Sequence, residues 1–153
     1  MINLGIYLKD LADAQWIDVL QSEIVRAKKD NQLSDVSIFY DNIGPVQMKV
    51  DAGFFNSTDI WNFNGDLITT CLETLIKSTN SVNNMNTYYC FGYGAYDVLS
   101  MLRTLNTKKI PTIALDEDSA RNFYRITNIK PISVNSNFTG VVQTIMEHKN
   151  GRN

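Results

Sequence analysis

Two glycines stand one residue apart in the segment YYCFGYGAYDVLSML, residues 88–102. The turn Gly92-Tyr93-Gly94 follows an aromatic run typical of a strand and precedes a helical pattern that we expect to begin near Ala95. A helix N-terminus offers free N–H groups, and glycine lets a ligand approach the backbone closely, so the turn is a candidate anion site. Asp97 stands where the full dinucleotide fingerprint has its third glycine, and its carboxylate would repel a phosphate. We therefore favour a structural turn over a ligand cradle.

An acidic triplet, Asp116-Glu117-Asp118, follows another expected strand. Adjacent carboxylates at a strand end can hold magnesium when a substrate phosphate completes the coordination shell. Acidic residues also suit the first turn of a helix, where they complement its dipole. We favour this capping role, because no basic partner or second acidic cluster can be tied to the triplet. A small magnesium-dependent enzyme that combines the triplet with Asp10 or Asp41 is an alternative.

The elements that must position these groups alternate between two patterns. Short β-branched and aromatic runs predict strands at 2–8, 35–40, 66–70, 87–91, 111–115 and 131–134. Longer amphipathic segments predict helices at 14–29, 72–82, 95–105, 116–128 and 138–148. Asp13 is the expected N-cap of the first helix. Between them, residues 47–50 are a candidate short edge strand, and a capped helical turn is expected to open at Asn56 or Ser57.

This alternation is typical of βαβ units and a parallel sheet. We predict a three-layer α/β/α sandwich of the Rossmann-like or flavodoxin-like type, with a mostly parallel sheet of about five or six strands. One domain is expected over residues 1–149, followed by a frayed tail at 150–153.

Ligands of open α/β sheets bind outside the carboxyl ends of the strands, near the point where strand order reverses. That rule turns the predicted strands into a set of candidate ligand-binding residues. They are Lys9, Asp10, Asp13, Asp41, Thr69, Thr70, Gly92, Tyr93, Gly94, Asp116, Asp118 and Asn135.

Composition excludes several classes of function. The 153 residues carry 20% charged residues of both signs and a net charge of −2, without the basic face that a nucleic acid requires. No apolar run approaches the length of about 20 residues that a membrane helix needs, and the first residues lack a signal-peptide pattern. The two cysteines have no metal-binding spacing. We expect a soluble, cytoplasmic protein with no metal and no cofactor.

Residues 92–111, GYGAYDVLSMLRTLNTKKIP, and the following TIALDEDSA resemble a segment of two-domain (B-type) glycosyltransferases. In the second Rossmann-like domain of that family, a strand end carries E-G-F-G, then a helix L-P-x-L-E-A-M-A, then G-x-P-V-I-A. Gly92-Tyr93-Gly94 match the G-F-G, Met101 matches the helix methionine, and residues 111–114 match P-V-I-A. The resemblance covers about a fifth of the chain and implies a domain that binds a nucleotide or nucleotide sugar.

The departures from the family pattern bear on catalysis. The two family glutamates, which contact the donor sugar and the nucleotide ribose, fall on Phe91 and Leu99. The glycines that normally follow P-V-I-A are replaced by the acidic triplet at 116–118. The chain has about half the length of a two-domain enzyme. The resemblance therefore implies ligand binding without catalysis.

A second function is a non-enzymatic interaction or scaffold role. The segment GFFNSTDIWNFN, residues 53–64, is rich in aromatic residues and asparagine. An exposed apolar patch at this segment would mark a surface for a partner or for a homo-oligomer.

Overall fold

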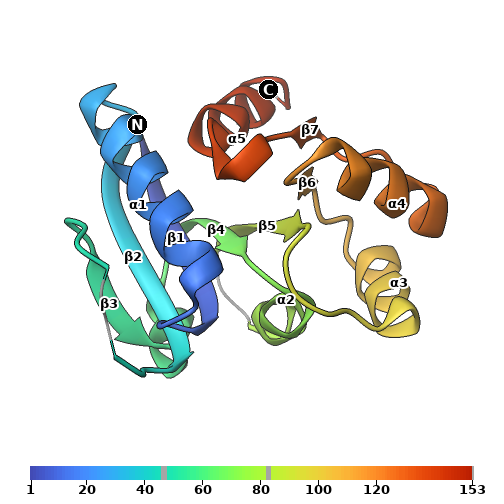
Figure 1. Cartoon of the computed structure of the whole chain (residues 1–153), viewed down its shortest axis with the longest axis horizontal. Helices are drawn as coiled ribbons and strands as arrows, with labels where there is room; N and C mark the ends of the chain where they lie inside the picture. Colours follow the sequence, from blue (N-terminus) through green and yellow to red (C-terminus); the bar gives the residue numbers. More distant parts are fainter. Residues whose placement is uncertain (46–47, 82–83, 153) are drawn as a thin grey trace.

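A single parallel β-sheet forms the centre of the computed structural model, with β3 at one edge and β7 at the other (Figure 1). The structure describes residues 1–45, 48–81 and 84–152, and within these ranges seven strands follow the order β3-β2-β1-β4-β5-β6-β7. All neighbouring strands run parallel. The strands are β1 (Ile2–Asp10), β2 (Leu33–Asn42), β3 (Gly53–Asn56), β4 (Gly65–Thr69), β5 (Met85–Phe91), β6 (Thr112–Ala114) and β7 (Ser133–Val134). The predicted α/β class and parallel sheet are confirmed, with seven strands instead of five or six.

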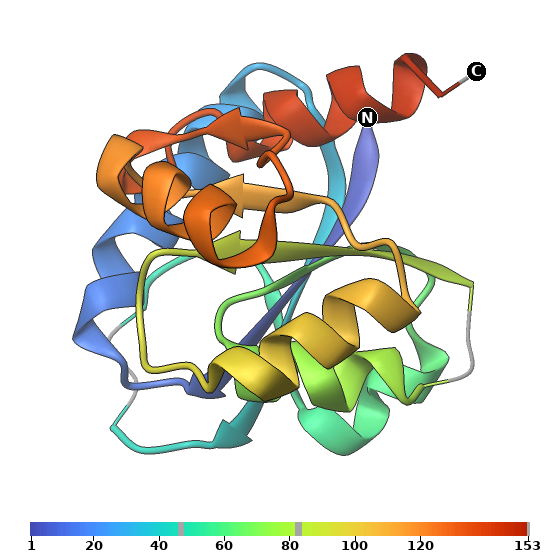
Figure 2. The same ribbon diagram turned by 90° about the vertical axis from the view of Figure 1, so that its right-hand side faces the viewer.

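Helices cover both faces of the sheet, which gives three layers (Figure 2). The helices are α1 (Ala14–Lys29), α2 (Leu72–Thr79), α3 (Val98–Thr107), α4 (Glu117–Thr127) and α5 (Val141–Asn150), with short 3-10 turns η1 (Ser57–Asn62) and η2 (Ser136–Phe138). Buried residues of α1 and α5 pack in one cluster, and those of α2, α3 and α4 in another. Right-handed crossovers explain this division, because the chain adds strands in opposite directions from β1 and from β4. No helix of the described residues is long and apolar enough to cross a membrane.

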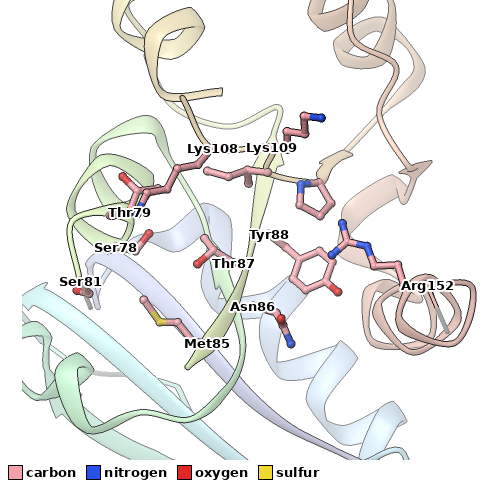
Figure 3. A pocket seen from close by; sticks show the side chains of 12 residues that line it. Ser78, Thr79, Ser81, Met85, Asn86, Thr87, Tyr88, Lys108, Lys109 and Arg152 are labelled. Carbon is pink, nitrogen blue, oxygen red and sulfur yellow. Dashed lines mark hydrogen bonds between the residues drawn. The ribbon is translucent and has the colours of Figure 1, made fainter. Parts of the chain in front are cut away.

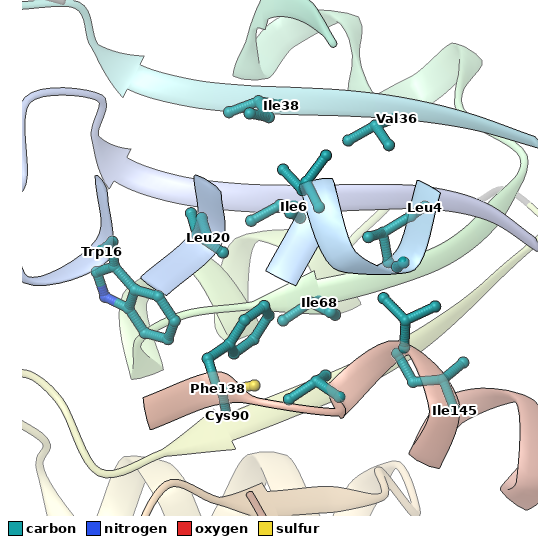
Figure 4. Packing of buried hydrophobic residues seen from close by; sticks show 14 of the residues in the cluster. Leu4, Ile6, Trp16, Leu20, Val36, Ile38, Ile68, Cys90, Phe138 and Ile145 are labelled. Carbon is teal, nitrogen blue, oxygen red and sulfur yellow. The ribbon is translucent and has the colours of Figure 1, made fainter. Parts of the chain in front are cut away.

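The larger core lies between the sheet and the α1–α5 layer (Figure 4). Leu4 and Ile6 of β1 point into it, whereas Tyr7 belongs to a smaller cluster on the opposite face. This alternation follows from the two-residue period of a strand. Leu20 of α1 and Phe138 are fully buried above the strands, so α1 is fixed over the centre of the sheet.

The α5 helix is joined to α1 by a buried carboxylate. Glu23 of α1 is 2% exposed and accepts hydrogen bonds from the backbone N–H groups of Gly140, at 2.9 Å, and Val142, at 3.1 Å. It also accepts two from Arg26, and these bonds raise the pKa of the guanidinium. Free N–H groups at a helix start need such partners. The helix therefore begins at Val141, three residues later than predicted.

Two other predicted segments can be compared with the structure. Of the candidate edge strand at 47–50, residue 47 lies outside the described residues, and 48–50 form no strand. Met48 packs into the larger core instead, and the edge strand is β3, where Phe54 pairs with Ile38. The helical turn is confirmed as η1, capped by Asn56, whose side chain accepts from the Thr58 backbone.

Candidate functional site

The order of the strands reverses between β1 and β4, since β2 and β3 follow on one side and β5 to β7 on the other. The loops after β1 and β4 lead to opposite faces, which leaves a crevice at their carboxyl ends. A cavity of about 240 Å³ opens there, which we call the switch-point cavity. Six of the predicted residues line it: Lys9, Asp10, Asp13, Thr70, Tyr93 and Gly94.

The charged groups of this cavity are bonded to neighbours. Lys9 Nζ lies 2.9 Å from an oxygen of Glu73, which raises the pKa of the lysine and lowers the pKa of the glutamate. Asp10 accepts a hydrogen bond of 2.7 Å from the Asn42 side chain. Asp13 is the predicted N-cap of α1 and accepts from the Gln15 backbone at 3.0 Å. With three carboxylates and one ammonium, the lining favours hydrogen-bond donors over a chain of phosphates.

Two aromatic side chains form one wall of the cavity. Trp16, in the first turn of α1, is 3% exposed and meets Tyr93 edge to face, with ring centroids 5.0 Å apart. Its other side packs against Phe138, at 5.5 Å. Burial, and then the nearby Asp116 charge, raises the pKa of Tyr93. Trp16 thus anchors this wall in the core, and Tyr93 adds a polar hydroxyl to it.

The start of α2 closes the cavity from the β4 side. Thr70 donates its hydroxyl to the Tyr7 carbonyl at 2.7 Å, across the two strands that border the crevice. Cys71 is the N-cap of α2, partly exposed in the cavity, and its thiol lies 3.7 Å from the Thr74 hydroxyl. The other thiol, Cys90, is buried in the larger core, which raises its pKa.

The glycine turn does not lead directly into a helix. The α3 helix begins at Val98, and Asp97 caps it by accepting from the Ser100 backbone at 2.8 Å. A Cβ atom on Gly92 would lie 2.8 Å from the Leu115 Cβ, so this glycine permits close packing against the following strand end. Gly94 has φ of +84°, a left-handed conformation, and faces the cavity. The favoured structural turn agrees with this geometry, and of the two glycines only Gly94 adjoins the cavity.

The remaining predicted residues lie elsewhere on the carboxyl rim. Asp41 accepts hydrogen bonds from Tyr7 and Lys77, both at 2.7 Å, on the α2 side of β1. Burial alone would raise the pKa of this carboxyl, but the bonds from Lys77, Ser57 and Tyr7 hold it below its usual value. The Thr69 hydroxyl, which is buried, donates to the Tyr88 carbonyl at 2.9 Å.

Three further candidates serve local turns. Asp116 caps α4 by accepting from the Ser119 backbone and hydroxyl, as the capping interpretation predicts. Asp118 is exposed and pairs with Arg121. Asn135 donates to the Thr139 carbonyl at 2.9 Å. Among residues 1–45, 48–81 and 84–152, no three His, Cys, Asp or Glu side chains gather in a group that could hold a metal ion.

Sequence reasoning missed part of the lining of the switch-point cavity: Leu8, Trp16, Cys71, Glu73 and Ala95. Cys71 and Glu73 directly follow a predicted strand, so extending the strand-end rule into the first helical turn finds them. Trp16 has the spacing of a core residue and packs as one, while one edge of its ring meets the cavity.

Comparisons with protein-family models, with curated proteins and with solved structures found no match to this chain. The glycosyltransferase-like resemblance therefore stays a hypothesis, and the geometry above is the basis for a function.

Proposed function

We propose that the chain is a ligand-binding Rossmann-like domain that holds the sugar portion of a nucleotide or nucleotide sugar in the switch-point cavity, without catalysing its conversion. The observation that carries this proposal is a polar cavity at the reversal of strand order between β1 and β4. In sheets of this kind, that crevice is where nucleotides bind.

The chemistry of the lining supports a hydroxylated ligand. Asp10 and Asp13 can accept hydrogen bonds from ribose or hexose hydroxyls, and Tyr93 offers an aromatic surface beside them. The volume of about 240 Å³ lies below the range of about 300–1,000 Å³ typical of whole small-molecule sites. We therefore place one sugar ring inside the cavity and the remainder of the ligand outside it.

The hydrogen bonds of the acidic groups support binding without turnover. A general acid needs a pKa near the working pH, but the bond from Lys9 holds the pKa of Glu73 below its usual value. Asp10 is bonded to Asn42, and Asp13 caps α1. These carboxylates are held as hydrogen-bond acceptors.

The test is thermal unfolding with uridine, adenosine, UDP-glucose and GDP-mannose, and with inorganic diphosphate as the control for the phosphates alone. A ligand at about ten times its Kd stabilises the protein by about 1.4 kcal/mol, which raises the Tm measurably. The substitution Asp10→Asn should reduce the shift, whereas Asp118→Asn, at the exposed Arg121 pair, should leave it unchanged. No shift with any nucleoside or sugar nucleotide at millimolar concentration would contradict the proposal, as would an equal shift from diphosphate.

A second candidate function is self-association through β3 and η1, favoured by exposed aromatic rings. Phe55 is 42% exposed and Trp61 is 56% exposed. Phe55 belongs to β3, the edge of the described sheet, and Trp61 to the η1 turn that follows it. Phe55, Phe39 and Phe63 line a hollow of about 400 Å³. An exposed edge strand with apolar side chains favours pairing with another strand.

The partner we propose for this edge is a second copy of the chain, paired β3 to β3. Light scattering across a concentration series should show a dimer, and Trp61→Lys should return it to a monomer. Arg121→Glu, a charge change at a remote exposed site, is the control. A monomer at every concentration would reject this candidate without affecting the sugar-binding proposal.

A further inference from the structure

A second cavity lies at the opposite end of the sheet, far from the switch-point cavity. Its volume is about 440 Å³, within the range of about 300–1,000 Å³ typical of small-molecule sites. It opens between the end of α3, the segments that lead into β6 and β7, and the end of α5. We call it the amino-end cavity, because it lies before the first residues of β6 and β7.

Cations surround this cavity without acidic neighbours. Lys109, Lys130 and Arg152 line it, and no Asp or Glu is among the described residues of the lining. An adjoining cavity of about 260 Å³, drawn in Figure 3, shares Lys109 and Arg152 and adds Lys108, again with no acidic residue among its described lining. The chain as a whole has more acids than bases, 16 against 14, so this concentration of positive charge is local.

Three of these cations form no ion pair with any described residue. Within the described residues, no carboxylate lies within 4.0 Å of the charged groups of Lys109, Lys130 or Arg152. Lys108 is the contrast, since its ammonium donates to the carbonyl of Thr79, the last residue of α2 (Figure 3).

Helix ends explain only part of this charge. The helices α3, α4 and α5 all end near the cavity, and cations complement the negative end of a helix dipole. Some carbonyls of the last turns are already bonded, however, since the backbone N–H groups of Lys108, Asn128 and Gly151 donate to carbonyls of α3, α4 and α5. Among the described residues, the side chains of these three cations are therefore available to a ligand.

Apolar side chains also line the cavity, together with the polar residues Asn106, Thr112 and His148. Leu105, Ile110, Ile129 and Ile132 line it, and Ile132 is 37% exposed. Thr112, the first residue of β6, also lines the cavity and is 2% exposed, yet its Oγ1 has no hydrogen-bond partner in the part of the chain that the structure describes. A buried hydroxyl without a partner costs about 1–3 kcal/mol, which a ligand oxygen could recover.

We propose that the amino-end cavity binds a small organic anion, with a carboxylate or phosphate head held by Lys109, Lys130 and Arg152 and a compact apolar body packed on Ile110, Ile129 and Leu105. Charge-assisted hydrogen bonds favour the head, and the body removes exposed apolar surface from water. This site is independent of the switch-point cavity, because no residue lines both.

The experiment is a titration of protein with labelled isoleucine methyl groups, followed by NMR. Isocaproate and isopentyl phosphate carry the two candidate heads, isopentylamine has the opposite charge, and acetate lacks the body. We expect saturable shifts of Ile110, Ile129 and Ile132 with the first two, and none at Ile24, which is buried on the inner face of α1. The tighter of the two anions identifies the head group.

Substitutions show whether the anion binds to these particular residues or is only attracted by the positive charge of the protein. Lys130→Gln and Arg152→Gln should each weaken binding by about threefold to tenfold, whereas Lys49→Gln, near the opposite edge of the sheet, should not change it. Thr112→Val, which removes the unpartnered hydroxyl, should also weaken binding. The proposal is overturned if no methyl shifts saturate, if isopentylamine or acetate binds as tightly as the anions, or if all four variants bind alike.

Discussion

At the carboxyl ends of β1, β2 and β4, charged side chains are bonded to one another, whereas at the amino ends of β6 and β7 those that the structure describes are not. Lys9 meets Glu73, Glu73 meets Lys77, and Lys77 meets Asp41, with N–O distances of 2.9, 3.4 and 2.7 Å. Lys109 at the other end has no such partner within the described residues.

The same contrast holds for buried threonine hydroxyls. Thr70 and Thr112 are each 2% exposed. Thr70, at the carboxyl end of β4, donates to the Tyr7 carbonyl, but Thr112, at the amino end of β6, has no partner among the described residues. The carboxyl ends of β1, β2 and β4 therefore gain stability from bonded polar groups, whereas at the amino ends of β6 and β7 the Thr112 hydroxyl has no partner among the described residues. The amino end of β4 differs from those of β6 and β7, because Asp66 is bonded there to Lys149 and Asn86. Unsatisfied groups lower stability and favour a ligand.

The largest effect should come from breaking the paired network at Asp41, whose side chain is only 15% exposed. Asp41→Asn keeps the shape but removes the nearer of the two carboxylates that Lys77 meets and leaves Glu73, at 3.4 Å, so we expect a loss of about 2 kcal/mol in the free energy of unfolding. Urea unfolding measures it. The control is Asp18→Asn on the exposed face of α1, which should change stability by less than about 0.5 kcal/mol. Equal losses from the two substitutions would show that the network contributes nothing specific.

The two ends should also lose stability in different pH ranges. The folded pKa of Asp41 is below its unfolded value, so its contribution is present above about pH 4 and is lost as the pH falls through the folded pKa. Burial, and then the Arg152 charge, lowers the pKa of His148 at the amino end. Its contribution is present above about pH 6.5 and is lost as the pH falls through its folded pKa.

Urea midpoints measured from pH 8 to pH 2.5 check this prediction, because the two steps should begin near the ordinary pKa values of histidine and aspartate, about 6.5 and 3.9. His148→Gln should flatten the upper step and leave the lower one, and Asp41→Asn should do the reverse. A curve that neither variant changes would contradict the assignment of the two ranges.

Replacing Thr70 and Thr112 by valine should change the free energy of unfolding in opposite directions. Thr70→Val removes a hydroxyl that makes a buried hydrogen bond and should cost about 1 kcal/mol. Thr112→Val removes one that makes none, so it should stabilise the unliganded protein by about 1 kcal/mol. Urea unfolding of both variants under the same conditions measures the difference. If both variants lose the same stability, Thr112 is satisfied in solution and the contrast between the ends fails.

Local signals explain which parts of the fold could be predicted. The α1 helix was predicted with its observed bounds because Asp13 caps it and Trp16, Leu20 and Ile24 recur on one face. The β3 strand was missed because four residues, Gly53–Asn56, are too few to show a period. Its conformation depends on pairing with β2, which is a tertiary contact.

Residues of the switch-point cavity could be predicted only where the end of a strand could be predicted. Lys9 and Asp10 end β1, and Thr70 follows β4, so the carboxyl-end rule finds them beside the crevice. Asp116 and Asn135 also follow strands, but β6 and β7 lie beyond β5, away from the reversal of order. Strand order depends on contacts between distant segments, which no local pattern records.

The smallest expected effect concerns the unpaired cations. Because Lys130 is exposed and has no acidic neighbour among the described residues, Lys130→Gln should change the free energy of unfolding by less than about 0.5 kcal/mol. Arg152→Gln should behave alike, and the double variant should be at least as stable as the unmodified protein, since like charges no longer share the rim. Urea unfolding at low and high salt measures both effects, because salt screens this repulsion. A loss near that of Asp41→Asn would mean that these cations stabilise the fold and are not held free for an anion.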